Sequence, residues 1–70
     1  MDVKTIKQAL EEKGELMIKT DSGEIFELHK HNVSFEESAG LIHIDGSSEL
    51  YWIDATKVEY YWIHKAAKEE

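Results

Sequence analysis

The chain has 70 residues and a net charge of −7, with 15 acidic side chains against eight lysines and no arginine. This balance disfavours nucleic-acid binding, because phosphate backbones are bound by clustered positive charge and bases are read largely by arginine. Without cysteine, the chain has no disulfide framework, no thiolate zinc site and no thiol nucleophile. The length fits a single domain over residues 1–70, and a core this small makes self-association a reasonable expectation.

Two further classes of protein are disfavoured. No stretch approaches the roughly 20 apolar residues of a membrane span, so we expect a cytoplasmic protein without a membrane partner. The serines lie in predicted turns, outside any nucleophile motif, and no glycine-rich phosphate loop is present. We therefore predict that the protein is not an enzyme and has no catalytic residues.

A helix is predicted over residues 3–13. Asp2 is a favourable N-cap, and Gly14 directly after Lys13 is a favourable helix end. One face of this helix is apolar and consists of Val3, Ile6, Ala9 and Leu10. Because so short a helix is marginal alone in water, we expect this face to pack on the rest of the domain.

Five β-strands are predicted after the helix, over residues 15–20, 24–31, 41–45, 49–53 and 58–64. Gly23 ends the Asp-Ser-Gly turn between the first two strands, where a positive φ is needed. The segment 32–40 is the longest connection and is expected to be a mobile loop, with Val33 and Phe35 as its anchors. The polar tail 66–70 is expected to fray.

The alternation of side chains assigns faces to these strands. Phe26 and Leu28 are expected to face the core in the second strand, as are Ile42 and Ile44 in the third, with His43 outward. The predicted fold is therefore α+β, an N-terminal helix followed by a five-stranded antiparallel meander that can close into a small barrel.

The region 15–64 resembles the Sm-like and SH3-like small-barrel architecture. The resemblance rests on the preceding helix, the Asp-Ser-Gly hairpin, the Ile-Asp-Gly strand end at 44–46 and the spacing of residues 53–58. Sm-type RNA sites use an Arg-Gly pair at the last corner, where this chain has Asp54-Ala55, and Asn32 alone does not restore the motif. The resemblance implies a barrel shape and does not imply RNA binding.

Three histidines and a glutamate form a candidate metal site. Glu27, His29 and His31 alternate along one predicted strand and so share a face. If this strand and the next pair antiparallel about Glu36, His29 lies opposite His43. Imidazole and carboxylate groups suit zinc, nickel or copper, although histidines on an outer sheet face are commonly only cross-strand neighbours.

The aromatic residues concentrate between positions 49 and 65, which hold both tryptophans and all three tyrosines. Two interpretations are open. The rings fill the core of a domain otherwise short of large residues, or some of them form a contact surface, because Trp and Tyr dominate interface energetics. The candidate protein-contact residues are Tyr51, Trp52, Tyr60, Tyr61 and Trp62.

Three functional hypotheses follow from the sequence. The first is a non-catalytic domain that acts through protein–protein contact, as a homodimer or as a subunit of a larger assembly. The second is a domain that binds a transition metal through its histidine-bearing sheet face, and no other cofactor is expected. The third is a small-barrel nucleic-acid binder, which the charge disfavours.

Overall fold

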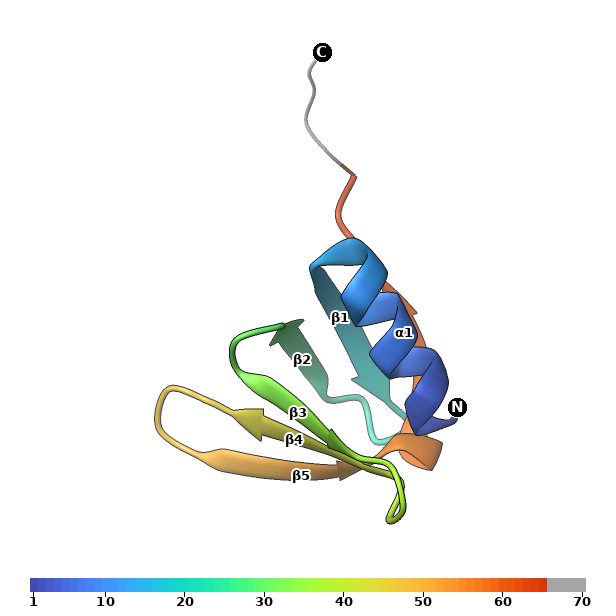
Figure 1. Cartoon of the computed structure of the whole chain (residues 1–70), viewed down its shortest axis with the longest axis vertical. Coiled ribbons are helices and arrows are strands. Elements are labelled where there is room, and N and C mark those ends of the chain that lie inside the picture. The colour runs from blue at the N-terminus through green and yellow to red at the C-terminus, as the bar shows by residue number, and fades with distance from the viewer. Residues whose placement is uncertain (66–70) are drawn as a thin grey trace.

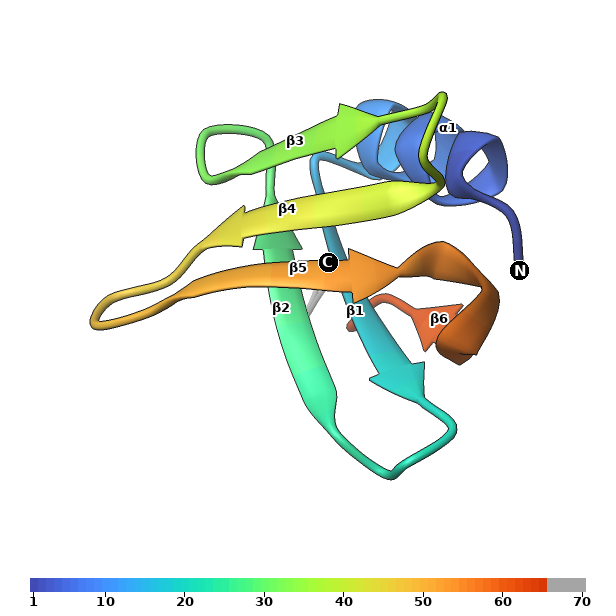
Figure 2. The same cartoon turned by 90° about the horizontal axis from the view of Figure 1, so that it is seen from below.

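The structure is a computed structural model that describes residues 1–65. In that part of the chain it contains one α-helix, six strands and a short 3₁₀-helix (Figures 1 and 2). In chain order these are α1 (Val3–Lys13), β1 (Glu15–Thr20), β2 (Ile25–His29), β3 (Val33–Glu36), β4 (Leu41–Asp45), β5 (Leu50–Asp54), η1 (Ala55–Lys57) and β6 (Val58–Trp62). The predicted α+β class is confirmed. The tail 66–70, which was expected to fray, lies outside the described residues.

Helix α1 has the predicted bounds, and both of its ends are capped as expected. The Asp2 carboxylate accepts hydrogen bonds from the backbone N–H and the hydroxyl of Thr5, at 2.9 and 2.6 Å. Gly14 adopts a φ of 86° and donates its N–H to the Leu10 carbonyl at 2.8 Å. Among residues 1–65, no helix is both long and apolar enough to cross a membrane.

The strands form two antiparallel sheets of three strands each. Sheet A has the order β2-β1-β6 and sheet B has the order β3-β4-β5. The chain passes from sheet A to sheet B between β2 and β3, and returns through η1 to β6. Figure 2 shows the strands of sheet B crossing over those of sheet A, with α1 beside them.

The core is aliphatic and lies between the sheets and the helix. Its largest fully buried side chains are Ile6, Leu16, Ile18, Leu28 and Ile42. The apolar face of α1 packs against β1 and η1, as the marginal stability of a short helix requires. The predicted inward positions are confirmed for Leu28, Ile42 and Ile44, while Phe26 is only partly buried against the core.

The predicted second strand and the loop after it differ from the structure. β2 ends at His29, because the Asn32 side chain accepts the His29 backbone N–H at 2.9 Å and closes a turn. The expected loop 32–40 contains a further strand, β3, in which Val33 and Phe35 pack against the core. The prediction of a single five-stranded meander is therefore wrong, and no closed barrel is found among the described strands.

The two aromatic strands are close to their predicted bounds. β5 spans Leu50–Asp54 where 49–53 was expected, and β6 ends at Trp62 where 64 was expected. η1 makes the corner between them, with the Asp54 carboxylate accepting the Thr56 N–H at 2.9 Å. The bonds from Thr56 hold the pKa of Asp54 below its usual value.

Candidate functional site

The sheet order leaves β5 and β6 each at the end of a sheet. Among the described residues, β5 pairs only with β4 and β6 pairs only with β1. Each therefore has one edge whose backbone groups are not paired to another described strand. Unpaired edges are places where a further chain can add a strand, and these two strands also carry the exposed aromatic rings.

The outer side of sheet B carries an apolar patch, here called the β5 face, made of Leu41, His43, Leu50 and Trp52. Trp52 is 58% exposed and Leu50 is 55% exposed. Trp52 pairs across the strands with His43, and their rings stack with centroids 4.7 Å apart. The His43 ring is held from the other side by a 3.4 Å contact between Nδ1 and the Ser34 hydroxyl. The Trp52 ring is therefore positioned while most of it remains in solvent.

The outer side of sheet A carries a second patch, here called the β6 face, made of Met17, Lys19, Ile25, Tyr60 and Trp62. Lys19 pairs with Tyr60 on one side and Ile25 on the other, and Met17 pairs with Trp62. The Tyr60 and Trp62 rings lie 5.3 Å apart, and the Lys19 ammonium lies 5.7 Å from the Tyr60 centroid. Tyr60 and Ile25 are 46% and 55% exposed.

Two of the predicted contact residues, Tyr51 and Tyr61, lie outside these patches. The Tyr51 ring packs inward, edge-on to Phe26 at 5.1 Å, and its hydroxyl donates to the Glu49 carboxylate at 2.5 Å. That bond raises the pKa of Tyr51 above its usual value. Tyr61 pairs with Ile18, on the side of β6 opposite to Tyr60, and is 37% exposed.

The core is not built from the aromatic rings. The fully buried large side chains of the described residues are all aliphatic. The interpretation that the rings fill the core is therefore wrong for Trp52, Tyr60 and Tyr61, which are exposed, while Trp62 is half-buried. Large exposed aromatic rings lower the solubility of a small domain. Their presence on two strands therefore favours a role in contact with another protein chain.

The four candidate metal ligands divide between two places. His29 lies opposite Glu15 on β1, and His43 lies opposite Ser34 and Trp52 in sheet B. The predicted pairing of His29 with His43 is therefore wrong, because β3 occupies the position next to β4.

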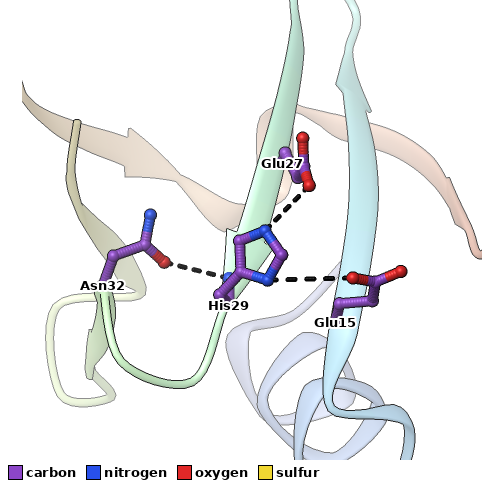
Figure 3. A network of polar contacts seen from close by, with 4 residues as sticks. All are labelled: Glu15, Glu27, His29 and Asn32. Atoms are coloured by element: carbon purple, nitrogen blue, oxygen red, sulfur yellow. Dashed lines mark hydrogen bonds and ion pairs between the residues drawn. The ribbon is translucent and has the colours of Figure 1, made fainter. Parts of the chain in front are cut away.

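Glu27 and His29 stay together on the outer side of sheet A, where Glu15 joins them (Figure 3), and His31 follows in the turn after β2. Glu27 contacts the His29 ring at 2.8 Å, and the His31 ring stacks on the His29 ring at 5.5 Å. Glu15 was missing from the predicted set, although the Asp-Ser-Gly turn at 21–23 could have revealed it. A hairpin centred on Ser22 places Glu15 opposite His29, which is the register observed.

The comparisons with known proteins add no family to this geometry: no protein-family model, curated protein or solved structure significantly matches the chain.

Proposed function

We propose that the protein is a non-catalytic domain that associates with further copies of itself through the β5 and β6 faces. The observation that carries this proposal is the exposure of large apolar side chains on two strands that also have unpaired edges. Side-chain burial and backbone pairing can then occur at the same interface, as they do when a strand is added to a sheet.

A second copy of the chain is a sufficient partner for these surfaces. Among the described strands, β5 and β6 each have an unpaired edge, and an edge in one copy can satisfy the N–H and C=O groups of an edge in another. Each aromatic side chain can bury about 150–250 Å², whereas a standard interface buries about 800 Å² on each partner. One face alone is therefore expected to give weak, concentration-dependent association, and edge pairing is expected to strengthen it.

We further propose that the two sheets are parts of one small SH3-like or Sm-like barrel. It is supported by two hydrogen bonds that attach η1, the link between the sheets, to a residue beside β4 of sheet B and to a residue beside β1 of sheet A. Ala55 donates to the Gly40 carbonyl at 2.9 Å, and Asp21 donates to the Lys57 carbonyl at 2.8 Å. In such an arrangement both aromatic faces point outward. A cytoplasmic location stays a prediction from the sequence.

The test is the mass in solution, measured by light scattering over a concentration series of the wild type, Trp52→Ala and Tyr60→Ala. Both rings are largely exposed, so neither substitution should disturb the core, and circular dichroism checks the fold of each variant. We expect the mass of the wild type to rise with concentration, and at least one variant to shift this rise to higher concentration. A wild type that stays monomeric at millimolar concentration would overturn the proposal.

The same two variants report the symmetry of the assembly. An interface that uses one face twice is isologous, so only one of the two substitutions should weaken it. A head-to-tail interface joins the β5 face of one copy to the β6 face of the next, so both substitutions should weaken it. Mixing the two variants would then restore a heterodimer, because each supplies the face that the other lacks.

A further inference from the structure

Three groups that can bind a metal gather at one end of the outer side of sheet A, as Figure 3 shows. Glu15 on β1 lies directly opposite His29 on β2, and Glu27 lies on the same side of β2. The His29 ring has Nε2 2.8 Å from Glu27 Oε2 and Nδ1 3.8 Å from Glu15 Oε1. The imidazole therefore lies between two carboxylates, one at each ring nitrogen.

This arrangement favours a positive charge between the two carboxylates. A neutral imidazole has one N–H and can donate to only one of the two carboxylates, which are acceptors when ionised. The other carboxylate then faces the lone pair of the second ring nitrogen, and this repulsion is removed either by a second proton on the ring or by a metal ion bound at that nitrogen. The surplus of acidic groups, with a net charge of −7 for the chain, adds to the attraction for a cation.

The spacing suits a metal ion after small side-chain movements. The three ligand atoms, one from each residue, lie within 4.8 Å of one another. Ligands at about 2.0–2.2 Å from a tetrahedral zinc are roughly 3.3 Å apart. One ion binds at one ring nitrogen only, so the glutamate at the other nitrogen has to rotate to the same side. The Glu15 and Glu27 side chains are 52% and 59% exposed and can rotate without moving the backbone.

The histidine is the fixed member of the set. Asn32 accepts the His29 backbone N–H at 2.9 Å and returns its own N–H to the His29 carbonyl at 3.2 Å. The His29 side chain is only 31% exposed. The turn closed by Asn32 also carries His31, whose ring stacks on that of His29 with centroids 5.5 Å apart.

We propose that Glu15, Glu27 and His29 bind one divalent transition-metal ion of the zinc, cobalt or nickel class. Water completes the coordination. Mixed imidazole and carboxylate ligands suit these ions, and calcium or magnesium would instead require an all-oxygen set. The site lies apart from the β5 face and adjoins the β6 face, because Glu27 pairs with Met17. The ligands all come from one chain, so the site does not require self-association.

The experiment is a titration of tag-free protein with cobalt, followed by visible absorption, and with zinc, followed by calorimetry. We expect one ion per chain and a cobalt spectrum that shows direct coordination to the protein. His29→Ala should weaken binding at least about tenfold, since a ligand should matter no less than the supporting groups of known sites. His43→Ala is the matched control, because its ring stacks on Trp52 in the other sheet, and its affinity should equal that of the wild type.

A second variant tests whether weaker metal binding in His29→Ala is caused by loss of the fold. Glu15→Gln combined with Glu27→Gln preserves shape and hydrogen-bonding capacity while removing both charges, and it should also weaken binding. Thermal unfolding provides an independent readout, because an ion that binds only the folded chain raises the midpoint increasingly as its concentration exceeds the dissociation constant. The absence of cobalt and zinc binding at millimolar concentration, or wild-type affinity in folded His29→Ala, would overturn the proposal.

Discussion

The Asp2 carboxylate stabilises the first turn of α1 through two hydrogen bonds from Thr5, and these bonds lower the pKa of Asp2 below its usual 3.8. A carboxyl group whose pKa is lower in the folded chain stabilises the fold above the unfolded pKa and loses this effect as the pH falls through the folded pKa. Asp2→Ala should therefore lower the thermal midpoint at neutral pH. The difference from the wild type should shrink below about pH 4, as followed by circular dichroism.

A matched control separates the cap from the charge. Glu12 is an exposed acidic residue on the same helix, so Glu12→Ala also removes one negative charge. Its effect on the midpoint should be smaller than that of Asp2→Ala at neutral pH. Equal effects for the two variants would show that the hydrogen bonds to Asp2 contribute little.

The side chain of Ile18 tests the position of the core. Ile18 is fully buried in β1, whereas Ile25, in the strand paired with it, is 55% exposed. Ile18→Ala should lower the free energy of unfolding by about 2–5 kcal/mol, because it leaves a cavity, and Ile25→Ala should change it by less than about 0.5 kcal/mol. Urea unfolding of both variants measures this difference, and similar losses would contradict the assignment of the two faces.

At the scale of elements, the parts that could be predicted from the sequence are those with local causes. Asp2 and Gly14 define the helix, and alternation places Ile42 and Ile44 in the core. The contact between Glu27 and His29 also followed from alternation, because both lie on one strand. These features need only neighbours in the chain.

The features that were missed depend on contacts between distant segments. Asn32 closes a turn that starts β3 within the expected loop, and this strand takes the place next to β4 that the second predicted strand was to occupy. The partner of His43 changed as a result from His29 to Ser34. A turn of this kind is weakly marked in the sequence, since the chain has no proline and Asn32 is one polar residue among several.

The hairpin of β4 and β5 positions the β5 face, and Gly46 is the residue that allows its turn. A Cβ atom at this position would lie 2.8 Å from the Glu49 carbonyl oxygen and 3.2 Å from the Tyr51 ring. Gly46→Ala should therefore destabilise the domain by about 1–3 kcal/mol, because backbone has to move. Urea unfolding measures this loss, and amide exchange should show it as faster opening of β5.

A matched glycine substitution distinguishes crowding from backbone preference. Gly23 has a φ of 94° and open space around its Cα, so Gly23→Ala tests backbone strain alone. It should destabilise the β1–β2 hairpin, while the amide exchange rates in β5 should stay close to those of the wild type. Faster exchange in β5 for both variants would mean that the two hairpins open together.

At the scale of the whole molecule, the charge and the apolar faces act against each other in self-association. Every copy carries a net charge of −7, so two copies repel one another while their exposed rings attract. Salt screens the repulsion between exposed charges and does not weaken apolar burial, and the screening length falls from about 10 Å at 0.1 M to about 3 Å at 1 M. Self-association should therefore strengthen as sodium chloride is added.

The direction of this salt dependence distinguishes an apolar contact between two copies from a contact held by opposite charges. A basic protein or a nucleic acid held by lysines would be bound through attraction between opposite charges, and that attraction weakens with salt. Light scattering from about 0.05 to 0.5 M sodium chloride measures the effect, and chloride is preferred to sulfate because sulfate itself strengthens apolar burial. A wild-type mass that falls as salt rises would contradict an apolar self-interface, since only opposite charges at the contact would give that direction.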